Sequence, residues 1–126
     1  MKVLTHACIG AGAISEKKHL SGYAKVPGVQ LAALCDINRD AADRMAKKFG
    51  IPAIFTDYQT MLQEIRPDLV SICTTNHLHR EMTIAALEAG AQVHLEKPVA
   101  LNAQEAAEIV SAVKRTGRQV MVALNN

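Results

Sequence analysis

The sequence predicts a doubly wound α/β fold, in which helices cover both faces of a parallel sheet of six strands. Apolar runs typical of buried strands alternate with helical stretches along all 126 residues. A glycine turn follows the first strand and opens the first helix, as expected where the chain crosses over to a parallel neighbour. We therefore expect one domain over residues 1–126, with the strand order 3-2-1-4-5-6.

Three strands and three helices are predicted in the first half of the chain. The strands are expected at residues 3–9, 29–35 and 51–55. The run at 29–35 is almost continuously apolar, which is typical of a parallel strand covered on both faces. The first helix follows the glycine turn. The second begins after Asn38, a good N-cap residue, and ends at Gly50. The third covers about residues 58–65 and stops before Pro67.

The second half continues the same alternation. Strands are expected at residues 69–74, 92–96 and 119–124, and a helix at 78–89 is stopped by Gly90. The last helix begins with a predicted capping box of Asn102 and Glu105 and ends at Gly117. One face of this helix is expected to be buried, and it consists of Ala106, Ile109, Val110 and Val113.

Composition argues against several classes of partner. The net charge is +2 and aromatic residues make up 3%, so we expect no nucleic-acid partner. No apolar run approaches the roughly 18 residues of a membrane helix, and the first strand begins too early for a signal peptide, so we expect a cytoplasmic protein without a membrane partner. The cysteines, Cys8, Cys35 and Cys73, lack metal-ligand spacing, and we interpret them as reduced structural thiols, with no metal site.

The glycine turn and the end of the second strand predict a dinucleotide site. Gly10 permits a tight turn, and Gly12 lets a pyrophosphate approach the backbone at the positive end of the following helix. Ser15 stands where such turns have a third glycine, and its small side chain still allows close packing of helix on sheet. Asp36, 21 residues after Ser15, is placed to accept hydrogen bonds from the adenosine ribose.

Lys97 follows the fifth predicted strand, at the edge of the sheet where ligands bind in folds of this kind. It lies between Glu96 and Pro98, and it has two interpretations. In the first, Lys97 hydrogen-bonds a substrate hydroxyl or carbonyl and serves as an acid–base group. In the second, it is a solvated side chain whose charge is offset by Glu96.

Polar residues also follow the fourth predicted strand. Thr74 and Asn76 suit a turn or a helix cap, and they are equally placed to meet a ribose or a phosphate. His77 and His79 either carry protons or bind a ligand, or one of them orients the helix that follows. The residues alone leave these alternatives open.

Together, these strand-end motifs resemble the nucleotide-binding half of the Gfo/Idh/MocA oxidoreductases, the family of glucose–fructose oxidoreductase and inositol dehydrogenase. The resemblance covers the whole chain and implies a Rossmann fold. It is carried by the glycine turn, Cys35-Asp36, Thr74-Thr75-Asn76-His77-Leu78-His79 and Glu96-Lys97-Pro98. The last of these is the most specific, because the glycine turn is common to many Rossmann proteins. Thr75 departs from the pattern, since the family often has proline there.

The resemblance implies binding roles for the matching positions. The pyrophosphate would be lined by Gly10, Gly12, Ala13 and Ile14. The rest of the dinucleotide groove would be lined by Thr74, Asn76 and His79. The neighbourhood of the nicotinamide would contain Glu96, Lys97 and, where the sixth strand meets the active site, Asn125.

The resemblance also implies a preference between cofactors and a catalytic group. Asp36 would hold the adenosine ribose and favour NAD, because the 2′-phosphate of NADP would meet its negative charge. Arg39 would soften that preference. Lys97 would touch the reacting hydroxyl of the substrate and ease its deprotonation.

The implied function is NAD-dependent hydride transfer to or from a hydroxyl of a sugar, a cyclitol or a related polyol. The family's second domain closes the substrate pocket, and these 126 residues do not include it. We therefore expect nucleotide binding without turnover, while a homo-oligomer stays possible. The alternative is a free-standing, non-catalytic nucleotide-binding or redox-sensing module. A third interpretation, a methyltransferase-like site for S-adenosylmethionine, is disfavoured by Glu96-Lys97-Pro98.

Overall fold

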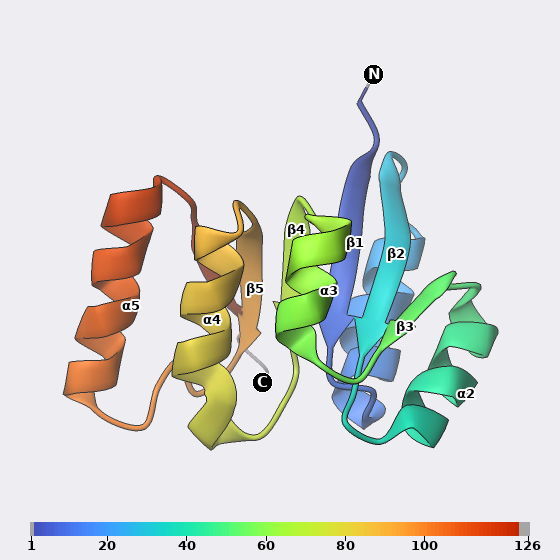
Figure 1. Ribbon diagram of the computed structural model, residues 1–126, viewed down its shortest axis with the longest axis horizontal. Coiled ribbons are helices and arrows are strands. Elements are labelled where there is room, and N and C mark those ends of the chain that lie inside the picture. Colours follow the sequence, from blue (N-terminus) through green and yellow to red (C-terminus); the bar gives the residue numbers. More distant parts are fainter. Residues whose placement is uncertain (1, 124–126) are drawn as a thin grey trace.

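A computed structural model describes residues 2–123 (Figure 1). Six strands form one parallel sheet in the order β3-β2-β1-β4-β5-β6, which confirms the predicted fold class and strand order. The strands are β1 (Leu4–Ile9), β2 (Val29–Cys35), β3 (Ala53–Phe55), β4 (Leu69–Ile72), β5 (Gln92–Glu96) and β6 (Val120–Ala123). The helices are η1 (Ser15–Leu20), α1 (Ser21–Ala24), α2 (Arg39–Phe49), α3 (Tyr58–Ile65), η2 (Asn76–Leu78), α4 (His79–Glu88) and α5 (Ala103–Thr116).

The sheet has a hydrophobic core on each face. Successive strand residues point to opposite faces, so Ala7 and Ile9 join one apolar cluster and Cys8 joins the other. The first cluster receives buried side chains from α3, α4 and α5, and the second receives them from η1 and α2. In Figure 1, α3 and α4 lie in front of the strands and the helix after β1 lies behind them.

Helix boundaries follow the predicted caps. The Asn38 side chain accepts a hydrogen bond from the Ala41 amide at 3.1 Å, and Gly50 ends α2 with a φ of 68°. α3 and β5 also have their predicted bounds. β3 and β4 are shorter than predicted, and a 3₁₀ turn, η2, precedes α4. Of the sixth predicted strand, residue 124 lies outside the described residues.

The last helix departs from the sequence prediction in two details. Asn102 accepts from the Glu105 amide at 2.9 Å, but the Glu105 carboxylate accepts from Leu101, one residue earlier than a capping box requires. The predicted burial of Val110 is wrong, because this side chain is 52% exposed. Ile109 and Ala112, three residues apart, form the buried stripe, and Val110 lies about 100° around the helix from Ile109.

Candidate functional site

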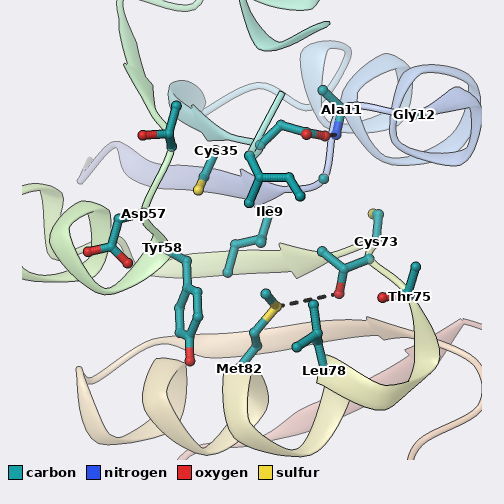
Figure 2. A pocket seen from close by; sticks show the side chains of 15 residues that line it. Ile9, Ala11, Gly12, Cys35, Asp57, Tyr58, Cys73, Thr75, Leu78 and Met82 are labelled. Atoms are coloured by element: carbon teal, nitrogen blue, oxygen red, sulfur yellow. Dashed lines mark hydrogen bonds between the residues drawn. The ribbon is translucent and has the colours of Figure 1, made fainter. Parts of the chain in front are cut away.

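The carboxyl ends of β1, β2 and β4 surround a cleft of about 670 Å³ (Figure 2). It opens where the strand order reverses between β1 and β4, the usual ligand crevice of a doubly wound sheet. Its volume falls within the range of small-molecule sites. The lining brings together four of the residues singled out from the sequence: Gly10, Gly12, Asp36 and Thr74.

The two glycines of the turn differ in whether the surrounding structure requires a glycine there. Gly10 has a φ of 106°, and a Cβ there would lie 2.6 Å from the carbonyl oxygen of Cys73, so only glycine fits. A Cβ added at Gly12 would have no heavy atom of the described residues within 4 Å, apart from atoms of Gly12 itself and its two chain neighbours. Packing within residues 2–123 therefore explains why residue 10 is a glycine. It does not explain the glycine at position 12, whose backbone is left uncovered at the cleft.

Asp36 connects the end of β2 to the glycine turn. One of its carboxylate oxygens accepts a hydrogen bond from the Ala11 amide at 2.8 Å, and the other accepts from the Asn38 amide at 2.8 Å. A carboxylate oxygen can accept more than one hydrogen bond, so both oxygens retain capacity toward a ligand in the cleft. Asp36 thus shapes the turn and faces the cleft at the same time.

The other residues predicted around the phosphates lie at the margin of this cleft. Ala13 and Ile14 are exposed at the start of the helix that follows the turn, and they are outside the cleft lining. Arg39 is exposed at the first position of α2, also outside the lining. The main chain of Asn76 lies in η2.

Two of the three groove residues predicted after β4, Thr74 and His79, lie in different surroundings. Thr74 lines the cleft, with its hydroxyl 3.4 Å from the sulfur of Met82 in α4. His79 is fully buried, and its ring nitrogens lie 2.6 Å from the Pro98 carbonyl oxygen and 3.0 Å from that of Thr74. The side chain of His79 therefore braces two loops of the site, whereas His77 is exposed.

Glu96 is the last residue of β5, and Lys97 directly follows it. Glu96 is 7% exposed, and its carboxylate lies 2.8 Å from Nε2 of His19. It lines a smaller cavity of about 290 Å³ together with His94 and residues of β6. Lys97 is exposed. Asn125, the remaining predicted residue, lies outside the described residues.

A buried polar layer between η1–α1 and the sheet was not predicted. Nε2 of His6 lies 2.7 Å from the Ser71 hydroxyl, the rings of His6 and Tyr23 stack at 4.4 Å, and the Tyr23 hydroxyl lies 3.0 Å from Nδ1 of His94. The rings of His94 and His19 are 4.3 Å apart. A signal was present in the sequence, because His6, Ser71 and His94 interrupt apolar strands with polar side chains.

The histidines of this layer differ in their protonation. Burial, with the charges of His19 and His94, lowers the pKa of His6 to about 3. Burial also lowers the pKa of His94. Burial opposes the charge on His19 as well, but interactions with Cys73 and Glu96 outweigh it and raise the pKa of His19. Of these three histidines, His19 beside the Glu96 carboxylate is therefore the one that protonation favours most.

Neither a metal site nor a membrane span is found in residues 2–123. No three or more of their His, Cys, Asp and Glu side chains gather as ligands of one ion. Their helices are also too short or too polar to cross a membrane.

Comparison with known proteins places the chain in a family. Residues 4–124 match the Gfo/Idh/MocA model, which is described as an oxidoreductase family with an NAD-binding Rossmann fold. The chain is 38% identical over 112 residues to D-glucoside 3-dehydrogenase of Escherichia coli (strain K12), a match that covers 89% of this chain and 32% of that protein.

Solved structures share the fold. The myo-inositol 2-dehydrogenase of Lactobacillus plantarum superposes with a TM-score of 0.89 and 29% identity, over 97% of this chain and 36% of that one. A 3-ketoreductase of Actinomadura kijaniata in complex with TDP-benzene and NADP has a TM-score of 0.87 at 24% identity, over 94% of this chain and 38% of that one, and shows the fold alone. The chain spans about a third of the length of these relatives. It belongs to the Gfo/Idh/MocA oxidoreductases and carries their NAD-binding Rossmann fold.

Proposed function

We propose that residues 1–126 bind NAD for an oxidoreductase that transfers hydride between the nicotinamide and a hydroxyl-bearing carbon of a sugar, a cyclitol or a related polyol. The observation that carries the proposal is the uncovered backbone at Gly12 beside the Ala11–Asp36 hydrogen bond, at the crevice of the sheet. The names of two relatives, a glucoside dehydrogenase and an inositol dehydrogenase, support the substrate class.

The pyrophosphate is assigned to the glycine turn. Helix starts carry free amide groups and a positive dipole end, both of which favour an anion. Gly12 presents its backbone to the cleft without a side chain, so a phosphate oxygen would approach the turn closely. Ala13 and Ile14, exposed at the same helix start, would flank the phosphates.

The adenosine ribose is assigned to Asp36. Its carboxylate already accepts two main-chain hydrogen bonds, which fix its orientation, and each oxygen can accept another from a ribose hydroxyl. The 2′-phosphate of NADP would bring a second negative charge to the same place, so NAD is the preferred cofactor. Arg39, exposed at the start of α2, would reduce that penalty.

The nicotinamide end is assigned to the loops after β5 and β6. Bound NAD would accept or supply the hydride. Lys97 would donate a hydrogen bond to the substrate oxygen and lower the free energy of its deprotonation, and Glu96, held by His19, would stand beside it. Asn125 would contribute from the end of β6, while Thr74, Asn76 and His79 would shape the groove between the two ends.

Residues 1–126 by themselves are expected to bind cofactor without turning over substrate. The sequence spans about a third of the length of the dehydrogenases it matches, and a substrate pocket generally needs more surface than one crevice edge supplies. A substrate complex would therefore draw on further chain or on a partner.

Calorimetric titration with NAD and NADP tests the cofactor assignment. The wild-type chain should bind NAD saturably and more tightly than NADP. Asp36→Ser should weaken NAD binding by about 10- to 100-fold, because charge-assisted hydrogen bonds contribute about 1.5–3 kcal/mol. The same variant should also bind NAD and NADP with more similar affinities than wild type does.

Two controls separate binding from folding. Asp40→Ser removes an exposed carboxylate from the first turn of α2 and should leave both affinities unchanged. Circular dichroism should report the same helix content for all three proteins. The proposal fails if the folded wild-type chain does not bind NAD at millimolar concentration, or if Asp36→Ser binds NAD as well as wild type does.

A further inference from the structure

His79 joins the loop after β4 to the loop after β5. It is the first residue of α4, and its side chain is fully buried. Nδ1 of the ring lies 2.6 Å from the carbonyl oxygen of Pro98, and Nε2 lies 3.0 Å from that of Thr74. Each ring nitrogen therefore faces a main-chain carbonyl, and the two carbonyls belong to segments that α4 and β5 separate in the sequence.

The number of protons on the ring decides how many of these contacts are hydrogen bonds. A carbonyl oxygen only accepts hydrogen bonds, and a neutral imidazole carries a proton on one nitrogen only. A neutral His79 would therefore place the lone pair of its other nitrogen against a carbonyl oxygen, whichever tautomer it adopted. Such a contact is costly where water does not reach the groups. An imidazolium, with an N–H group at both nitrogens, donates to both carbonyls.

The distance to Pro98 and the surroundings of the ring bear on this charge. N–H···O hydrogen bonds usually span about 2.7–3.2 Å, and charged donors form the shorter ones, so the 2.6 Å contact fits an imidazolium. Burial and the positive dipole end of α4 oppose a cation. No carboxylate of the described residues forms an ion pair with this ring. The two carbonyl oxygens are therefore the groups that hold its second proton.

The other charged and titratable side chains of the surrounding segments differ from His79 in their contacts. Ion pairs with residues other than His79 engage Arg80, Glu96, Glu105 and Glu108. The exposed side chains are those of His77, Glu81 and Lys97. The exposed groups exchange protons with water directly, whereas the His79 ring gives up a proton only by losing a main-chain hydrogen bond.

The two segments that His79 joins belong to different parts of the candidate site. A Cβ at Gly10 would lie 3.4 Å from the amide nitrogen of Thr74, so the main chain of Thr74 packs against the glycine turn, and Thr74 also lines the cleft. Pro98 directly follows Lys97 in the other segment. The ring of His79 therefore connects the wall of the cleft to the segment that carries Lys97.

We propose that His79 is a positioning residue, whose doubly protonated ring holds the loop after β4 and the loop after β5 at a fixed separation. When the ring loses one proton to water, one of the two carbonyls loses its donor and the link between the loops is broken. The charge of the ring follows from its contacts alone, whereas its effect on the cofactor rests on the proposed function. His77, two residues earlier and exposed, is the matched control for the charge.

Nitrogen-15 NMR of the histidine rings tests the charge without any ligand. At about pH 7.5, His79 should carry protons on both ring nitrogens, whereas His77 should be mainly neutral, because an ordinary histidine loses its second proton near pH 6.5. His79→Gln and His77→Gln each remove one set of signals and so assign the spectra. A His79 ring with one bare nitrogen at this pH would overturn the proposal.

The main-chain amide signals of Thr75 and Val99 test the link between the loops. Each of these amides belongs to the same peptide group as one of the two carbonyls that face His79. Between about pH 6 and 9, any change in one signal should accompany a change in the other, at the pH at which the His79 ring loses its proton. Neither signal should change in His79→Gln. Signals that change at different pH values, or that follow the titration of His77, would contradict the link.

Calorimetry with NAD tests the consequence for the cofactor. An asparagine amide reaches the position of Nδ1 and a glutamine amide that of Nε2, so His79→Asn and His79→Gln each keep one of the two hydrogen bonds. Both variants should bind NAD at least about 10-fold more weakly than wild type, because neither joins the two loops. Glu81→Gln, at an exposed position of the same helix, should leave the affinity unchanged.

Circular dichroism should show that the three variants are folded. NAD binding as tight as that of wild type, in either His79→Asn or His79→Gln, would refute the positioning role, because one hydrogen bond would then suffice. A folded wild-type chain that binds no NAD contradicts the proposed function instead, while the ring spectra still decide the charge of His79.

Discussion

His6 shows how one buried side chain links this fold to pH. It is fully buried in β1, and burial together with the charges of two neighbouring histidines lowers its pKa to about 3. An unfolded histidine has a pKa of about 6.5. Below pH 6.5, His6 therefore binds a proton in the unfolded chain but stays neutral in the folded chain until the pH approaches 3. The contribution of His6 to stability is present above pH 6.5 and is lost as the pH falls toward 3.

Urea unfolding of wild type and His6→Gln at pH 7.0, 5.5 and 4.5 measures this effect. Between pH 5.5 and 4.5, wild type should lose up to about 1.4 kcal/mol more stability than the variant, the value of one proton per pH unit. The lowered pKa of His94 changes stability with pH in the same direction, and the raised pKa of His19 changes it in the opposite direction. Both histidines are present in each protein, so their effects do not distinguish the two. Identical pH slopes for the two proteins would contradict this account of His6.

Single residues differ in how far the sequence predicts their positions. Gly10, Gly12, Asp36 and Thr74 meet at the cleft as predicted, because each lies within three residues of a strand end and the ends of parallel strands share one edge. The link from His19 to Glu96 was beyond prediction. It joins residues 77 positions apart in the sequence through a side chain of η1, and no local pattern records which way that side chain points.

At the scale of elements, the turn between β1 and η1 allows folding and NAD binding to be tested separately, because its two glycines differ in what requires them. Gly10 is required by its backbone conformation and its contact with Cys73, whereas Gly12 has open space where a side chain would be. Gly10→Ala should therefore lower the free energy of unfolding by more than about 2 kcal/mol. Gly12→Ala should change it by less than about 1 kcal/mol but weaken NAD binding at least about 10-fold, because the new Cβ would face the proposed pyrophosphate site.

Gly22→Ala provides the matched control for these two variants. Gly22 lies in α1 and also has open space around its Cβ position, but it does not line the cleft. Its replacement should change neither stability by more than about 1 kcal/mol nor NAD affinity. Urea unfolding and calorimetry on the three variants check these expectations. A Gly12→Ala protein that unfolds readily, or that binds NAD normally, would remove the distinction between the glycines.

Helix boundaries could be predicted from the sequence where a residue close in the chain caps or ends the helix. Asn38, Gly50 and Asn102 act within one turn of helix, so their roles follow from the sequence. Val110 was misjudged because which side of α5 is buried depends on how the helix sits on the sheet, a tertiary property. β4 also ends two residues earlier than predicted, and the segment after it is held by a tertiary contact, between Nδ1 of His79 and the Pro98 carbonyl oxygen at 2.6 Å.

At the scale of the whole molecule, the site is a consequence of topology. The chain winds outward from β1 to β3 and then from β4 to β6 on the other side (Figure 1). The loops after β1 and β4 part where the order reverses, which opens the cleft. The alternation of strands and helices predicts this arrangement. The buried polar layer on the η1 side is a second whole-molecule feature, and it brings His19 and Glu96 together at the smaller cavity.

The most direct test of the central claim, that the crevice at the strand ends binds NAD, is a ¹⁵N-resolved NMR titration of the chain with NAD. The amide signals of Ala11, Gly12, Ile37 and Thr74 should move together and saturate, because all four residues line the cleft. The signals of Gly28, Gly90 and Gly117, which precede strands at the opposite edge, should stay in place. Signals that stay unchanged at millimolar NAD, or that move mainly at those three glycines, would contradict the account.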